Sequence, residues 1–139
     1  MKQLMKLTAI AIIAGIVLAG LLNIIQSLTG NHAYILLFNM DYIPLLKQWN
    51  NTYGAGMVFH FATCIASVIV LFYLLKPLQR SLTFLPYFLT YTIGGGILYS
   101  LTALTELPPA LTDTTAWGIW TLGHGVYGIV IGLLMKYWK

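Results

Sequence analysis

The sequence predicts an all-α integral membrane protein, a four-helix bundle that forms a single transmembrane domain over residues 1–139. The composition is 59% hydrophobic and only 7% charged, whereas soluble domains contain about 25% charged residues. Four apolar segments also approach the roughly 20 residues that a helix needs to cross the hydrocarbon core of a bilayer. These two observations exclude a soluble enzyme and a disordered tail.

The four predicted helices span about residues 7–27, 54–75, 83–104 and 116–135. Inside a bilayer, backbone polar groups must be paired within a helix or a closed barrel. The four segments lack the alternation of polar and apolar residues that barrel strands show, so helices are favoured. Short polar connections separate the last three segments.

The first connection, an outer loop over residues 28–53, is longer and is not plainly polar. It contains two apolar patches, residues 33–38 and 42–46, which are interrupted by asparagines and by Asp41. Neither patch is long enough to cross a membrane. Two interpretations remain open: an interfacial helix or re-entrant flap that caps the outer face, and an ordinary ordered loop.

The distribution of charge predicts that both termini are cytoplasmic. Cations lie before the first helix, between the second and third, and after the fourth: Lys2, Lys6, Lys76, Arg80, Lys136 and Lys139. With four spans these three groups share one side, and lysine and arginine favour the cytoplasmic side. The opposite side has Lys47 together with all three acidic residues of the chain.

A duplicated helical hairpin is a further hypothesis. The second and fourth helices each place a histidine in the outer half of a helix that runs inward, and the first and third share a glycine pattern at Gly15 and Gly96. Such a duplication would produce parallel repeats that are related by an axis along the membrane normal.

His60 and His124 are ionisable residues within predicted spans, where such groups are rare and costly. At 1.5 Å per residue, both lie roughly 9–12 Å below the outer boundary of the membrane. The two helices run in the same direction. The two imidazoles are therefore at a similar depth and could face each other across the bundle.

Three functions fit this pair of histidines. The leading hypothesis is an outward-facing polar site at His60 and His124, with Thr63 and Tyr99 as further polar groups, which binds or passes a small solute or a proton. The alternative is a site for haem or a metal ion, in which Cys64 shares a helical face with His60 and adds a soft ligand. The third interpretation is structural, with each histidine as an interhelical hydrogen-bonding partner.

Glycines mark predicted faces of close helix packing, because small residues let helix backbones approach each other in lipid. These residues are Gly15, Gly20, Gly94, Gly95, Gly96, Gly128 and Gly132. The same faces would serve for self-association or for binding as a partner subunit of a membrane complex. We therefore expect the lipid bilayer and either a homo-oligomer or a membrane partner.

Several function classes are not supported by the sequence. His60 and Cys64 have no acidic residue within the spans to complete a catalytic triad, so an enzyme is not expected. No glycine-rich loop is followed by the basic residue of a phosphate site. The seven basic residues are too few and too scattered for a nucleic-acid footprint.

From about residue 58 to 138 the chain resembles the YagU-like family of small bacterial inner-membrane proteins. The resemblance rests on three features in the family's order: His60 followed by Thr63, Ser67 and Tyr73; a glycine-rich third helix that leads into Leu107-Pro108-Pro109 and Asp113; and Gly123-His124 followed by Val126-Tyr127.

The chain departs from the family pattern at Trp120, where an acidic residue is expected, and in its shorter first outer loop. The resemblance implies a multi-pass protein of the bacterial inner membrane and adds weight to His60 and His124. It does not imply a reaction.

Overall fold

The computed structural model describes residues 1–50 and 52–138, and these are helical with no strand. Lys139, one of the predicted cytoplasmic cations, and Asn51 of the predicted outer loop lie outside them. The elements are α1 (Lys2–Thr29), α2 (Ala33–Leu36), η1 (Lys47–Trp49), α3 (Ala55–Leu75), α4 (Phe84–Leu98), η2 (Tyr99–Leu104) and α5 (Thr114–Tyr137). Among them α1, α3 and α5 are each long and apolar enough to cross a membrane. The predicted helical class is confirmed.

The helix boundaries follow local sequence signals. α1 begins at Lys2 rather than at residue 7, because nothing between Lys2 and Lys6 breaks a helix. It ends at Thr29, and the capping residue Gly30 takes a left-handed φ of 73° and donates its N–H to the carbonyl of Gln26. α5 begins after Asp113, whose carboxylate accepts a hydrogen bond from the N–H of Ala116 at 2.8 Å.

The segment predicted as one helix over residues 83–104 divides into two elements. The α-helix α4 ends at Leu98, and the chain continues as the 3-10 helix η2 to Leu104. A 3-10 helix has three residues per turn, so the side chains after Leu98 point in directions that an α-helical register does not give. This change decides where Tyr99 lies.

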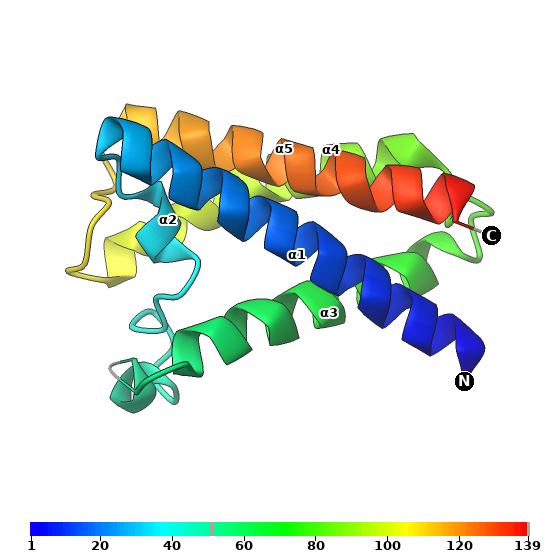
Figure 1. The fold of residues 1–139 in the computed structure, drawn as a ribbon, viewed down its shortest axis with the longest axis horizontal. Helices are drawn as coiled ribbons and strands as arrows, with labels where there is room; N and C mark the ends of the chain where they lie inside the picture. The colour runs from blue at the N-terminus through cyan, green and yellow to red at the C-terminus, as the bar shows by residue number, and fades with distance from the viewer. Residues whose placement is uncertain (51, 139) are drawn as a thin grey trace.

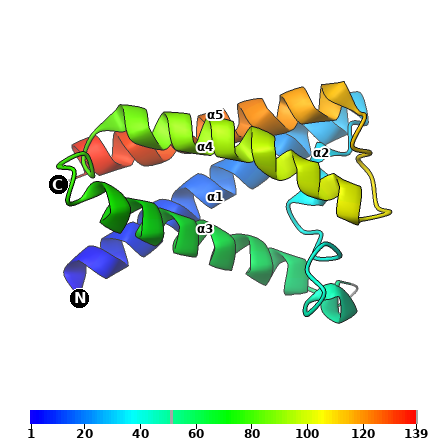
Figure 2. The same ribbon diagram turned by 180° about the vertical axis from the view of Figure 1, so that it is seen from behind.

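The long helices pack in three close pairs. α4 and α5 lie antiparallel and side by side, while α1 crosses both α3 and α5 (Figures 1 and 2). α3 and α4 make little direct contact. The start of α1, the end of α5 and the connection from α3 to α4 lie at one end of the molecule, which we call the inner end. Residues 30–50, 52–54 and 105–113 lie at the other, the outer end (Figure 1). At the inner end, Lys6 Nζ donates to the carbonyl of Trp138.

The outer segment, residues 31–50, is an ordered cap rather than a long interfacial helix. Its regular structure consists of the single turn of α2 and the three residues of η1. The cap packs with α1 and α5, and five of its residues are buried: Ala33, Leu36, Leu37, Asn39 and Met40.

Side-chain hydrogen bonds fasten this cap to the segment after η2. Asn39 Nδ2 donates to Thr105 Oγ1 at 3.0 Å and so joins the cap to that segment. Within the cap, the amide of Asn50 donates to Asp41 Oδ1 at 2.9 Å. Asn39 Oδ1 also accepts the backbone N–H of Asp41 at 2.9 Å. We call Asn39, Asp41, Asn50 and Thr105 the outer clasp.

Glycines occupy the closest helix contacts within the chain. A Cβ atom at Gly95 would lie 2.5 Å from Cβ of His124, and one at Gly128 would lie 2.8 Å from the carbonyl oxygen of Tyr87. A Cβ atom would similarly meet Phe84 at position 132, Phe61 at position 15 and Thr121 at position 96. Positions 20 and 94 differ from this pattern, because a Cβ atom there would meet nothing within 4 Å. Gly20 and Gly94 therefore do not mark close helix contacts within one chain, contrary to the prediction.

Candidate functional site

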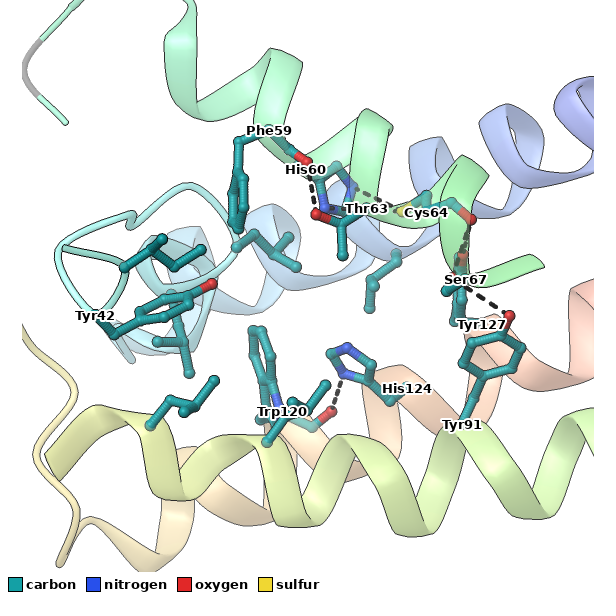
Figure 3. Close-up of a pocket in the computed structure, with 16 residues that line it drawn as sticks. Tyr42, Phe59, His60, Thr63, Cys64, Ser67, Tyr91, Trp120, His124 and Tyr127 are labelled. Atoms are coloured by element: carbon teal, nitrogen blue, oxygen red, sulfur yellow. Dashed lines mark hydrogen bonds between the residues drawn. The ribbon is translucent and has the colours of Figure 1, made fainter. Parts of the chain in front are cut away.

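A cavity of about 350 Å³ lies where α3 and α4 stay apart, within the usual range of roughly 300–1,000 Å³ for ligand pockets. α1, α3, α4, α5 and the outer cap all contribute to its wall (Figure 3). Most of the surface is apolar. The lining residues with polar side-chain atoms are Tyr42, His60, Thr63, Cys64, Ser67, Tyr91, Trp120, His124 and Tyr127.

His60 lies on α3 and is buried against α1. Its Nε2 is 3.2 Å from the carbonyl oxygen of Gly15, and because a carbonyl only accepts, Nε2 carries the hydrogen. A glycine at position 15 permits the close approach, since a Cβ atom there would lie 3.2 Å from Sγ of Cys64. The sulfur lies 3.9 Å from Nδ1 of His60.

His124 lies on the opposite wall of the cavity, on α5 (Figure 3). Its Nδ1 donates to the carbonyl of Trp120 at 2.9 Å, and its ring packs on the Trp120 indole with centroids 4.3 Å apart. The residue is only 9% exposed. Within the described chain, Nε2 of His124 has no hydrogen-bond partner. The ring therefore presents an unused nitrogen to the cavity.

Hydroxyl groups at the inner end of the cavity are engaged with one another. Ser67 donates to the carbonyl of Cys64 at 3.0 Å, Tyr91 donates to Ser67 Oγ at 3.4 Å, and Tyr127 donates to the carbonyl of Cys64 at 3.4 Å. The rings of Tyr91 and Tyr127 meet edge to face at 4.7 Å. Higher on α3, Thr63 donates to the carbonyl of Phe59 at 2.8 Å. Each of these four hydroxyl groups therefore donates its hydrogen to an acceptor within the protein.

Tyr42 contributes the outer wall from the cap (Figure 3). Burial raises the pKa of its hydroxyl, so this group keeps its proton at neutral pH. No protein acceptor takes this hydrogen within the described chain. Tyr42 is thus the lining hydroxyl that is free to donate as well as accept.

The structure brings some predicted site residues together and separates others. His60, Thr63, Cys64 and His124 all line the cavity. Tyr99 does not, because its hydroxyl donates to the backbone carbonyls of Ala110 and Asp113, at 2.9 and 3.1 Å. It ties η2 to the start of α5 instead.

The predicted three-ligand metal site is not formed. Among the described residues, no three His, Cys, Asp or Glu side chains gather closely enough to hold a metal ion. His60 and Cys64 are neighbours on one helix turn, but His124 stands on the facing wall (Figure 3).

Five polar or aromatic lining residues were not predicted as site residues from the sequence: Tyr42, Ser67, Tyr91, Trp120 and Tyr127. Ser67 falls one helical turn after Cys64 and two after His60, so the face of α3 could have been followed further. Tyr42 had no comparable signal, because only folding brings the cap over the helices.

Comparison with known proteins found no matching family model, no similar curated protein and no similar solved structure.

Proposed function

We propose that this chain is a polytopic membrane protein that binds a small, largely apolar molecule in the cavity between α3 and α4. The observation that carries the proposal is the cavity itself. Two helices that make little direct contact leave a mostly apolar space, and a few polar side chains line it, with His60 on one side and His124 on the other. Mostly apolar pockets with a few placed polar groups are typical of small-molecule sites.

The length of the third helical segment supports four membrane crossings. The 15 residues of α4 rise about 22 Å at 1.5 Å each. The six residues of η2 add about 12 Å at 2.0 Å each. Together they exceed the roughly 30 Å hydrocarbon core. In the proposed bundle, α4 and η2 together form the third membrane crossing, which follows α3 and precedes α5 along the chain.

The placement of charge supports a cytoplasmic location for the inner end. Lys2, Lys6, Lys76, Arg80 and Lys136 belong to segments at that end, and the acidic residues belong to the outer end. Membership of the YagU-like family and a home in the bacterial inner membrane remain proposals that rest on the sequence resemblance. The duplicated hairpin also remains a proposal, supported by the pairing of α1 with α3 and of α4 with α5.

Binding fits the cavity better than proton transfer or catalysis. A proton relay needs groups that hydrogen-bond in a chain, whereas each histidine here bonds to a separate backbone carbonyl. No aspartate or glutamate lines the cavity, so the site offers no carboxylate to act as a base.

Tryptophan fluorescence provides a direct test, because Trp120 lines the cavity and is only 6% exposed. A variant with Trp49→Phe, Trp117→Phe and Trp138→Phe leaves Trp120 as the one emitter. We expect bromodecanol, a brominated straight-chain alcohol, to quench this protein in nanodiscs with a saturable curve. Quenching that rises only linearly with probe would count against a binding site.

A matched pair of substitutions separates the cavity from the lipid-facing surface. Thr63→Phe adds a ring to the cavity wall, whereas Thr90→Phe adds the same ring to an exposed position of α4 that does not line the cavity. We expect Thr63→Phe to abolish saturable quenching and Thr90→Phe to preserve it. Equal effects of the two changes would overturn the proposal.

The rival hypotheses give different results on the same sample. A bis-histidine haem protein would show a Soret band that is lost in both His60→Ala and His124→Ala. A purely structural partner subunit would show neither that band nor saturable quenching of Trp120.

A further inference from the structure

We propose that the molecule bound in this cavity is an apolar compound that carries a hydrogen-bond donor, such as an alcohol or an N–H group, and that Nε2 of His124 is its acceptor. This inference rests on the proposed binding function. It names the chemistry of the ligand, which the existence of the cavity does not decide.

The first argument is the tautomer of His124. Its Nδ1 must carry a hydrogen, because its partner at 2.9 Å is the carbonyl oxygen of Trp120. No carboxylate lines the cavity to pair with a charged imidazolium. In the neutral ring, Nε2 then holds a lone pair and can only accept.

The second argument is the cost of leaving that nitrogen unused. His124 is 9% exposed and lies on the cavity wall, and Nε2 has no partner in the described chain. Nε2 keeps some accessible surface at the cavity wall, and an apolar ligand that fills the cavity would remove that surface from water, which costs free energy unless the ligand supplies a partner. An apolar ligand with one donor supplies the missing hydrogen bond, whereas an ether or a hydrocarbon does not.

The third argument is the state of the other polar groups. The hydrogens of Thr63, Ser67, Tyr91 and Tyr127 are each donated to a protein acceptor. His60 likewise spends its Nε2 hydrogen on Gly15. At these positions of the cavity wall, the protein therefore offers lone pairs rather than hydrogens. Tyr42, at the outer wall, is the exception.

The rest of the ligand must be mostly hydrocarbon. Leucines, an isoleucine and aromatic rings make up the remaining wall: Leu18, Leu36, Leu37, Ile43, Phe59, Leu98 and Leu101, with the ring of Trp120. A second charged or strongly polar group on the ligand would lie against these side chains without a partner, at a large cost. The site therefore selects one donor on an apolar body.

The experiment compares bromodecanol with its methyl ether by quenching of the Trp120-only protein in nanodiscs. The two probes share the chain and the bromine, and the ether lacks the donor. We expect the alcohol to bind about tenfold more tightly per mole of probe in the bilayer, the size of effect that one buried hydrogen bond gives. Equal affinity would overturn the inference and leave the proposed function standing. Failure of both probes to bind saturably would sink the proposed function as well.

Substitutions assign the preference to one atom. His124→Leu should bind both probes equally, because it removes the acceptor and keeps an apolar side chain of similar size. His124→Gln should retain part of the preference, since its amide oxygen still accepts. Tyr42→Phe should leave the preference unchanged, and its loss there would overturn the assignment to His124. If His124→Leu fails to fold, the comparison of the two probes on the unsubstituted site still decides whether the ligand needs a donor, and His124→Gln together with Tyr42→Phe decides which residue accepts it.

Discussion

α4 has two neighbours in this molecule, and it meets them in opposite ways. Against α5 it packs so closely that a Cβ atom at Gly128 would lie 2.8 Å from the carbonyl oxygen of Tyr87 and 3.0 Å from Cα of Phe88. Toward α3 it makes little direct contact, and a cavity of about 350 Å³ lies between them. One helix therefore forms both a closely packed interface and one wall of the candidate site.

The difference between the two interfaces comes from the residues that face each other. Gly95, Gly128 and Gly132 remove side chains from the contact of α4 with α5, and backbones can then meet. Toward the cavity, α3 presents Thr63 and α4 presents Tyr91, together with larger apolar groups. Tight packing on one side holds α4 rigidly, so the space on its other side can keep its shape.

The largest expected effect is at the tight interface. Gly128→Leu places a branched side chain against the backbone of α4, and we expect it to lower the free energy of unfolding by about 3 kcal/mol. Gly94→Leu is the matched control, because a Cβ atom there meets nothing within 4 Å. Thermal unfolding of both variants in detergent measures the difference. Similar losses of stability would mean that the interface between α4 and α5 is not closely packed.

A smaller effect is expected at the outer clasp, which holds the cap over the cavity. Asn39→Ala removes the bonds to Thr105 and to the N–H of Asp41, and we expect a loss of about 1–2 kcal/mol. The same variant should bind bromodecanol more weakly, since the cap contributes Tyr42 to the cavity wall. Thr105→Ser keeps the hydroxyl and should behave as the unsubstituted protein. An Asn39→Ala protein with full stability and affinity would show that the cap needs no clasp.

The smallest effect is expected at the outer start of α5, the helix that carries His124. Asp113→Ala removes the cap bond to the N–H of Ala116 and should cost about 1 kcal/mol. Asp113→Ser, which can still cap, should recover most of this loss. Circular dichroism during thermal unfolding compares the two variants. If serine did not recover stability, the carboxylate would act through its charge rather than as a cap.

The sequence predicted how deep the main site residues lie in the membrane, but it did not predict which way each side chain points. Two histidines in inward-running helices implied a shared depth, and the structure puts both on the cavity wall. Tyr99 was assigned to the same site because it lies on the third apolar segment. The switch to a 3-10 helix at that residue turns its hydroxyl toward Ala110 and Asp113. No feature of the sequence predicted this change from an α-helix to a 3-10 helix.

The sequence by itself determined the helical class and the approximate limits of the helices, because long apolar runs bounded by charges and prolines leave few other choices. Only the tertiary structure decided which faces meet. Lipid and protein interior are equally apolar, so the composition of a helix face does not tell a packed face from a lipid-facing one. Gly95 and Gly94 are adjacent and identical in type, yet a Cβ atom at position 95 would clash with His124 and one at position 94 would meet nothing within 4 Å. The cavity has the same origin, since it depends on two helices not meeting.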